Sequence, residues 1–438
     1  MQTITIHGRR TLHGSIRPAA AKNSTLPLLA ATLLCDGPCC LRDVPRLADV
    51  DTSLALLDAV GARVRRCGAD LCTRPADRLC GDIPEHLAGA MRSSVFYLAP
   101  LLCRVGYVRL PLPGGCRLGP RPVDIHLAGL AAMGAEVELE GIAVTLRRTG
   151  PLHGVDFTLR LPSVGATMTL LMAACCAAGQ TVLRGAAQEP EIGDMIAFLS
   201  ACGADIQGAG TPVLTVQGGR PLGGAFHRPL PDRIAAATYA AALACAGGQI
   251  EIAGCDPASY DSFLRFLAGT GVQVSRVGDC VRLARDPAVP LRGGAHLRAD
   301  AWPAFATDTA PLAAAVLLTA AGESEIYDSL FANRFACAAG FAAMGAALCS
   351  SDYGERSFDE VLDRLEKSVD SVGLVDTMPP LFDSQEEYDA FLTRHNAMHP
   401  PEVDIHTYTG AAWLGIDAGS TTTKIALITA DGGLLYTY

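Results

Sequence analysis

Five stretches of this chain repeat one pattern, and this repeat restricts the possible fold more than any other feature of the sequence. In each stretch, apolar residues recur at helical spacing, a glycine follows where the helix must stop, and alternating residues typical of a strand come next. The glycines are separated by 73, 69, 68 and 74 residues. The copies cover residues 50–64, 123–139, 190–206, 259–274 and 333–348, with turn glycines Gly61, Gly134, Gly203, Gly271 and Gly345.

A repeated α/β unit of about 70 residues is too long for an ordinary solenoid, so it predicts similar layered modules grouped into domains. The 438 residues suffice for two or three domains, and a composition of 50% hydrophobic and 18% charged residues allows a large core. The net charge of −10 argues against nucleic acid as the main partner. Apolar runs such as 310–321 are shorter than the ~18 residues of a membrane span, and no signal-peptide pattern opens the chain, so we expect a cytoplasmic protein.

Lys22 is the only lysine in the first 366 residues, and the other lysines are Lys367 and Lys424. Lysine presents a compact charge that suits a small anion, whereas arginine presents a planar fork. The apolar run 26–34 follows, and we expect a buried helix opened by a cap from Asn23, Ser24 or Thr25. A lysine beside a helix N-terminus predicts an anion site.

Polar groups precede other apolar runs in the same way. Residues 112–124 form a loop rich in glycine and proline, in which Arg117 and Arg121 flank Cys116 and would stabilise its thiolate. Asp308 either caps the helix that follows it or acts as a base. Arg92 and the segment Ser163, Val164 and Gly165 also stand at predicted helix starts.

The other cysteines sit mostly in apolar runs. Pairs such as Cys39–Cys40 and Cys175–Cys176 predict small buried hydrophobic groups in a reducing compartment. Because the sequence contains no Cys-x-x-Cys and no Cys/His ligand spacing, it predicts no metal site.

Read together, these motifs resemble the enolpyruvyl transferase superfamily, and within it the UDP-N-acetylglucosamine 1-carboxyvinyltransferase family. The matching segments span residues 1–350, in the family's order. They are Lys22-Asn23, the helix that begins at Asp49, the loop from Pro113 through Cys116 to Asp124, Ser163-Val-Gly-Ala-Thr, Glu189-Pro-Glu191, Asp232-Arg233, Pro303-x-Phe-x-Thr-Asp308 and Phe331-x-Asn333-Arg334-Phe335.

The resemblance implies an α/β fold of two inverse α/β barrels, each built from three repeats. It implies a complete domain over 22–229, and a second domain from 1–21 and 230–350 that lacks the sixth repeat. It also implies transfer of the enolpyruvyl group of phosphoenolpyruvate to the sugar 3-hydroxyl with release of phosphate, the first committed step of peptidoglycan precursor synthesis, without metal or organic cofactor.

The resemblance assigns roles to individual residues. Cys116 would be the acid and the site of a covalent adduct, and Asp308 would be the base. Lys22, Arg92 and Arg121 would hold phosphoenolpyruvate. The nucleotide-sugar site would be lined by Asn23, Arg121, Pro122, Val123, Asp124, Ile125, Ser163, Val164, Gly165, Asp308 and Leu330.

The sequence departs from the family pattern in three places. The lysine expected near the uridine is replaced within 161–163, and the acidic residue expected before Asn333 is Ala332. The sixth repeat is absent, together with the C-terminal arginines that complete the phosphoenolpyruvate site. We therefore expect an unfilled gap in the second domain.

The tail differs from the rest of the chain. Residues 351–411 are charged and broken by prolines, as in a linker, and 413–428 predict a strand, a tight turn and a strand. The run from Asp417 through Ser420 to Lys424 resembles the phosphate-binding hairpin of the acyl-CoA dehydratase activase family, in the sugar kinase, Hsp70 and actin superfamily. Because 14 residues follow Lys424, we expect residues 412–438 to be a fragment of that domain.

Three functions are compatible with the sequence. The first is an active nucleotide-sugar enolpyruvyl transferase. The second is a truncated, inactive protein that still binds the nucleotide sugar, and the third is an ATP-binding module carried by the tail.

Overall fold

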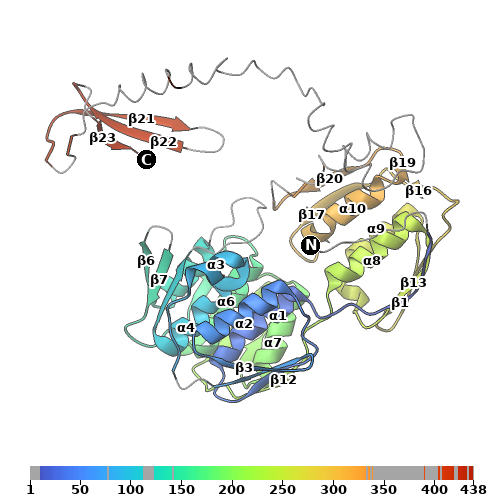
Figure 1. Cartoon of the computed structure of the whole chain (residues 1–438), viewed down its shortest axis with the longest axis horizontal. Coiled ribbons are helices and arrows are strands. Elements are labelled where there is room, and N and C mark those ends of the chain that lie inside the picture. Colours follow the sequence, from blue (N-terminus) through green and yellow to red (C-terminus); the bar gives the residue numbers. More distant parts are fainter. Residues whose placement is uncertain are drawn as a thin grey trace. The chain divides into compact units, whose positions relative to one another are not determined.

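The computed structural model describes residues 10–75, 78–111, 123–140, 143–331, 334–335, 338, 389, 403–404, 407–418, 423–431 and 434–437. The chain divides into two units, Met1–Met344 and Gly345–Tyr438. The first is an α/β structure in which one module, a helix, a strand, a second helix and a β-hairpin, recurs along the chain (Figure 1).

The first copy shows the module in full. Its central strand β2 pairs in parallel with β12 and antiparallel with β4, which pairs antiparallel with β3, so the sheet order is β12-β2-β4-β3. Because β12 follows the third copy in sequence, the chain returns to complete the sheet of the first. The elements are α1 (Lys22–Ala31), η1 (Thr32–Leu34), β2 (Cys39–Leu41), α2 (Ala48–Ala59), β3 (Arg63–Cys67), β4 (Asp70–Arg74) and β12 (Phe226–His227).

The second and third copies repeat this arrangement, with sheet orders β5-β7-β6 and β8-β9-β11-β10. The elements of the second copy are α3 (Glu85–Ala90), η2 (Arg92–Tyr97), α4 (Leu98–Val105), β5 (Tyr107–Pro111), α5 (Asp124–Ala132), β6 (Glu136–Glu140) and β7 (Ala143–Arg147). Those of the third are β8 (Asp156–Thr158), α6 (Val164–Cys176), β9 (Gly179–Arg184), α7 (Pro190–Ala201), β10 (Asp205–Gln207) and β11 (Val213–Gly218).

The fourth copy takes its parallel edge strand from the beginning of the chain. Strand β1 pairs with β13 along its whole length, from Leu12 opposite Gly248 to Ile16 opposite Ile252. The sheet order is β1-β13-β15-β14. The elements are β1 (Leu12–Ile16), α8 (Arg233–Ala246), β13 (Gly248–Ile252), η3 (Pro257–Tyr260), α9 (Asp261–Thr270), β14 (Gln273–Val277) and β15 (Cys280–Arg285).

The fifth copy is described only in its first half. Strand β17 pairs in parallel with β20 and with β18, and β16 pairs in parallel with β19. The elements are β16 (Leu291–Arg292), β17 (His296–Asp300), β18 (Phe305–Ala306), η4 (Thr307–Thr309), α10 (Ala310–Leu317), β19 (Ala320–Ala321) and β20 (Glu325–Asp328). The second helix and the hairpin expected for this copy, and the expected gap beyond them, fall on residues outside those described.

The turn glycines are confirmed in the four copies where they are described. Gly61, Gly134, Gly203 and Gly271 have φ of 91°, 100°, 105° and 102°, and each follows the end of the second helix of its copy. An L side chain rarely adopts this left-handed conformation, so glycine ends the helix and turns the chain into the next strand. Gly345 lies outside the described residues.

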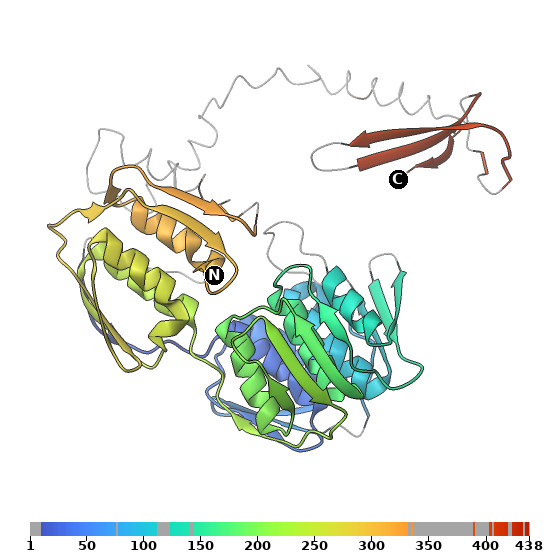
Figure 2. The ribbon, with the colours of Figure 1, turned by 180° about the vertical axis from the view of Figure 1, so that it is seen from behind.

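Two separate hydrophobic cores hold the first unit together. One core gathers buried residues of the first three copies, from Leu26 to Ala225, and the other gathers residues of the later copies, from Ala236 to Val316. Figure 1 shows the blue to green elements around α1, α2, α6 and α7, and the yellow and orange elements around α8, α9 and α10. From behind, the green sheet of the third copy lies across its lobe (Figure 2). We call the part around the first core, from Leu26 to Ala225, the first lobe, and the part around the second core, from Ala236 to Val316, the second lobe.

The second unit contains one antiparallel sheet of order β21-β22-β23 within its described residues. The two predicted strands are confirmed by β21 (Ala412–Ala418) and β22 (Thr423–Thr429), which pair antiparallel, with β23 (Leu434–Thr437) added at the edge. The predicted turn between them lies outside the described residues. Most of the predicted linker lies outside the described residues. Across the described part of the chain, no helix combines the length and apolar character that crossing a membrane requires.

Candidate active site

The predicted site residues begin equivalent helices of different copies. Lys22 opens α1, Arg92 opens η2 ahead of α4, Val164 opens α6, and Asp308 lies in η4 immediately before α10. Within the first lobe, η2 contacts both α1 and α6. Helix N-termini present unpaired backbone N–H groups and a partial positive charge, so this set of helix starts favours anionic ligands.

Lys22 stands at the exposed start of α1. Its Nζ lies 3.0 Å from Oδ2 of Asp49, in the first turn of α2, and the two side chains are 47% and 37% exposed. Asn23 is exposed beside it. The ammonium is therefore oriented by a carboxylate and still open to a further anion.

The predicted cap of α1 is wrong. The N-cap residue is Ala21, which offers no side-chain hydrogen bond, and Ser24 and Thr25 are fully buried. The Ser24 hydroxyl donates instead to the Asp194 carboxylate on α7. The Ser24 hydroxyl, which the local sequence suggests as a helix cap, is thus used in packing against the third copy.

A buried histidine lies beneath the predicted nucleotide-sugar residues. His126 follows Asp124 and Ile125 in α5, is 4% exposed, and neither ring nitrogen makes a hydrogen bond of normal geometry. A Cβ on Gly165 would lie 2.9 Å from its Nε2, so the glycine leaves room for the ring. Burial, and then the positive charge of Arg92, lower the pKa of His126 to about 4, while the Val123 carbonyl opposes this weakly.

His126 is thus a neutral ring in α5 that lies against Gly165 in α6 and feels the charge of Arg92. It lies just outside the segment 121–125 that the sequence predicts. Its position one residue beyond the predicted segment was the only available signal, because its burial depends on Gly165 in another copy.

Asp124 and Ser163 mark two neighbouring helix starts. Ser163 is the N-cap of α6, and its Oγ accepts a hydrogen bond from the Ala166 N–H at 3.3 Å. The Asp124 carboxylate accepts a hydrogen bond from Arg160 at 2.6 Å, and this guanidinium holds the pKa of Asp124 below its usual range. Arg160 immediately precedes the 161–163 stretch that lacks the expected lysine, so a cation still stands next to this position.

Asp308 does not cap α10, because the N-cap residue of that helix is Thr309 and η4 begins after Ala306. Its Oδ1 accepts a hydrogen bond from Arg334 Nη2 at 3.2 Å, and its side chain is 37% exposed. Arg334 is 9% exposed and also donates from Nε to Thr307 Oγ1 at 2.9 Å. The arginine holds the carboxylate at the helix start with one face open to solvent.

Nearby backbone and side-chain groups fix this arginine. The Thr307 hydroxyl donates to the buried Asp328 carboxylate, which also lies 3.7 Å from Arg334 Nε. Asp328 accepts the N–H of Leu330 at 2.9 Å, so the turn that carries this half-exposed leucine is tied to the same network.

A buried ion pair connects the helix starts of the third and fourth copies. Arg233, the first residue of α8, donates from Nε to Glu191 Oε1 on α7 at 2.9 Å, and the side chains are 7% and 5% exposed. Burial raises the pKa of Glu189, and the charge of Asp308 adds to this effect. Burial lowers the pKa of Arg233, but the charge and hydrogen bond of Glu191 outweigh this effect and raise the pKa, and the charge of Asp308 adds to the rise.

The remaining predicted residues, Cys116, Arg121 and Pro122, lie outside the described residues. Within the first lobe, η2, which begins at Arg92, contacts α1 and α6, and α5, which carries Asp124 and Ile125 after Val123, packs on α6. Asp308 belongs to the second lobe, and its charge contributes to the raised pKa values of Glu189 and Arg233.

Comparisons with known proteins point in one direction. The family model described as EPSP synthase (3-phosphoshikimate 1-carboxyvinyltransferase) matches residues 6–360. The UDP-N-acetylglucosamine 1-carboxyvinyltransferase of Rhodospirillum centenum is 39% identical over 357 residues, which cover 79% of this chain and 82% of the relative. The corresponding protein of Acidiphilium cryptum is 41% identical over 338 residues, covering 76% and 79%.

Solved structures show the same fold. The enolpyruvyl transferase NikO from Streptomyces tendae superposes with a TM-score of 0.68 at 22% identity, covering 77% of this chain and 80% of its own. An EPSP synthase from Acinetobacter baumannii gives a TM-score of 0.58 at 16% identity, with the same coverage. The likeness ties the repeated module to an established architecture.

Proposed function

The chain belongs to the EPSP synthase family of enolpyruvyl transferases, and on this premise we propose that it acts as a UDP-N-acetylglucosamine 1-carboxyvinyltransferase. It transfers the enolpyruvyl group of phosphoenolpyruvate to the 3-hydroxyl of UDP-N-acetylglucosamine and releases phosphate. The product enters peptidoglycan precursor synthesis, and we place the enzyme in the cytoplasm. The active site draws on a first domain over 22–229 and a second from 1–21 and 230–350.

The reaction is an addition followed by an elimination. In the addition, the sugar hydroxyl oxygen bonds to C2 of phosphoenolpyruvate, the hydroxyl proton passes to Asp308, and Cys116 donates a proton to the methylene carbon. In the elimination, the Cys116 thiolate takes back one methyl proton, phosphate leaves with the proton held by Asp308, and the enol double bond is restored. Such steps require an acid, a base and fixed cations at the phosphate and carboxylate.

The cations come from the helix starts. Lys22, Arg92 and Arg121 hold phosphoenolpyruvate, and Lys22 acts as a point charge on its phosphate. The nucleotide sugar is held by Asn23, by 121–125, by 163–165, by Asp308 and by Leu330. Arg334 positions the Asp308 carboxylate without blocking its open face.

One observation carries the proposal most directly. The residues that the family motif makes functional stand at the starts of equivalent helices in separate copies, and in the first lobe the segment η2, which begins at Arg92, contacts both α1 and α6. A module that repeats for packing alone gives no reason for lysine, arginine, serine and aspartate at these helix starts, whereas an anion site between copies does.

Phosphate release from phosphoenolpyruvate tests the proposal. We expect release with UDP-N-acetylglucosamine, and none with shikimate 3-phosphate or without an acceptor. Release with shikimate 3-phosphate would move the chain to the other branch of the family. Binding of the nucleotide sugar without release would identify an inactive binding protein, and absence of both would contradict the proposal.

Selective alkylation tests the role of Cys116. A small phosphonate epoxide that mimics phosphoenolpyruvate should label Cys116 far faster than the other fifteen cysteines, and the nucleotide sugar should accelerate labelling by closing the loop. Cys67 is an exposed thiol in β3 and serves as the internal control. Equal labelling of Cys67 and Cys116 would remove the case for a special thiol.

For the tail we propose phosphate binding of the activase type. The register of β21 and β22 places Asp417 opposite Lys424 and Ala418 opposite Thr423, on either side of the turn. Calorimetric titration of the whole chain with ATP should show binding that Lys424→Met weakens and Lys367→Met does not. Equal affinity in both variants would leave the hairpin without this role.

A further inference from the structure

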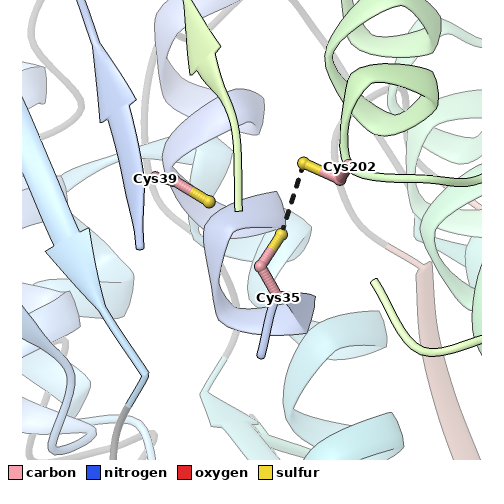
Figure 3. A group of neighbouring side chains, drawn as sticks. All are labelled: Cys35, Cys39 and Cys202. Carbon is pink, nitrogen blue, oxygen red and sulfur yellow. Dashed lines mark hydrogen bonds between the residues drawn. The ribbon is translucent and has the colours of Figure 1, made fainter. Parts of the chain in front are cut away.

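Three buried thiols from separate segments converge in the first lobe (Figure 3). Cys35 follows η1, Cys39 begins β2, and Cys202 follows the last residue of α7. They are 1%, 1% and 4% exposed, and their sulfur atoms all lie within 4.8 Å of one another. Cys35 and Cys202 are 167 residues apart in sequence, yet their Sγ atoms are separated by 3.6 Å.

The backbone fixes this convergence. The Asp36 N–H donates to the Leu222 carbonyl at 2.7 Å, and the Gly223 N–H donates to the Cys202 carbonyl at 2.7 Å. The Cys40 N–H donates to the Ala225 carbonyl at 2.9 Å. One short segment, 222–225, therefore ties the turn after α7 to the chain that carries Cys35 and Cys39, so the three sulfur atoms are preorganised.

The spacing suits three-coordinate binding of an ion. A metal–sulfur distance of about 2.3 Å in a trigonal plane places sulfur atoms about 4.0 Å apart. The Cys35–Cys202 distance and the 4.8 Å limit lie on either side of this value. A disulfide would need sulfur atoms about 2.05 Å apart, and it would leave the third thiol without a role.

The donor set selects the kind of ion. Thiolates prefer soft cations such as Cu⁺ and Zn²⁺, whereas Mg²⁺ and Ca²⁺ prefer oxygen. In the described part of the chain, this group contains three cysteines and no histidine or carboxylate. Three thiolates without a cation would be costly at this burial, so binding should release thiol protons as the ion enters.

We propose that Cys35, Cys39 and Cys202 form a binding site for a soft d¹⁰ cation of the Cu⁺ or Zn²⁺ class, which cross-links the first and third copies of the module. The site is separate from the helix starts assigned to the transferase reaction and from its chemistry. Its effect is structural, because it joins segments that are distant in sequence and closes the first lobe.

Metal titration of the whole reduced chain tests this site. Cd²⁺ added to metal-free protein should give a thiolate-to-metal absorption band that saturates at one equivalent. Zn²⁺ and Cu⁺, each titrated in competition with a chromophoric chelator, distinguish the two classes of ion. Excess ion should raise Tm by several degrees, because it binds the folded state preferentially.

Variants locate the site. Cys202→Ala and Cys202→Ser should remove the saturating band and the rise in Tm, and Cys175→Ala, a control at 3% exposure, should retain both. A band of equal strength in the Cys202 variants would overturn the proposal. So would wild-type protein with no band that saturates at one equivalent, a readout that does not depend on the folding of any variant. Aerobic loss of two thiols from Cys35 and Cys202, with no metal uptake by the reduced protein, would assign the cluster to disulfide chemistry instead.

Discussion

Helices α6 and α10 are equivalent elements of the two lobes, and they are buried very differently. The α6 sequence buries ten of its thirteen residues, whereas α10 buries three of its eight, although both consist largely of apolar residues. Leu318, immediately after α10, is 64% exposed. The difference in burial arises from the neighbouring helices. Helix α6 lies in a lobe built from three copies of the module, and it packs against helices of the second copy as well as its own.

An apolar hollow lies beside α10. Leu317, Leu318 and Ile326 contribute to its wall, together with Ala314, Gly322, Ser324, Phe335 and Ala338. The sequence of α10 is as apolar as that of a helix covered on all sides. The hollow lies in the fifth copy. The sixth repeat, which the sequence predicts to be absent, would follow this copy. Each copy therefore buries only part of its own apolar surface, and neighbouring copies bury the rest.

The largest expected effect concerns the chemistry assigned to the second lobe. Asp308→Asn should lower kcat by about 10²–10⁴-fold, because an amide cannot take the hydroxyl proton, while nucleotide-sugar affinity stays within about tenfold. Asp261→Asn is the matched control, since Asp261 also begins a helix and pairs with an arginine at 2.9 Å. Parallel losses of activity and Tm in Asp308→Asn would reduce the second lobe to a structural part.

The next effect concerns the ion pair that connects the lobes. Arg233→Met should destabilise the protein by about 3–5 kcal/mol in urea denaturation, because it leaves Glu191 buried without its partner. Arg282→Met removes an exposed partner of Glu251 and should cost far less stability, because solvent screens that ion pair. If the two variants lost equal stability, the buried Arg233–Glu191 ion pair would contribute no more to stability than an exposed one.

Acid should weaken the first lobe through His126. Its folded pKa of about 4 lies below the ordinary value of 6.5, so the unfolded chain binds more protons between these values. Stability is therefore fully present above pH 6.5 and falls by about 3 kcal/mol as the pH drops toward 4. Denaturation curves of His126→Gln should lack most of this loss, and those of the exposed-residue control His86→Gln should retain it. If the free energy of unfolding of His126→Gln fell with pH as steeply as that of the wild type, another group would be responsible for the loss.

The smallest effect should come from the uncovered face of the second lobe. Leu318→Ser should change the free energy of unfolding by no more than about 0.5 kcal/mol, because the side chain is already largely in water. Leu171→Ala, at a fully buried position of α6, should cost about 2–5 kcal/mol. A large loss on Leu318→Ser would show that this face is covered in solution.

Local features were predictable from the sequence, and features shared between copies were not. The four described turn glycines and the two paired strands of the tail follow from short-range patterns, and these are confirmed. The α1 cap was wrong because Ser24 finds Asp194, 170 residues away. The burial of His126 depends on Gly165, and the three-thiol cluster depends on Cys202 meeting Cys35, so neither is visible in local spacing.

The pairing of β1 with β13 has a consequence for biosynthesis. Residues 12–16 are made before the strand that receives them, 248–252, which follows 236 residues later. At synthesis rates of about 5–20 residues per second, this strand waits on the order of 10–50 s with its hydrogen-bonding edge open. The first lobe can fold in that interval, so the nascent chain carries a folded body with an unpaired strand on its N-terminal side. Such an edge is a natural binding site for chaperones and a starting point for aggregation during translation.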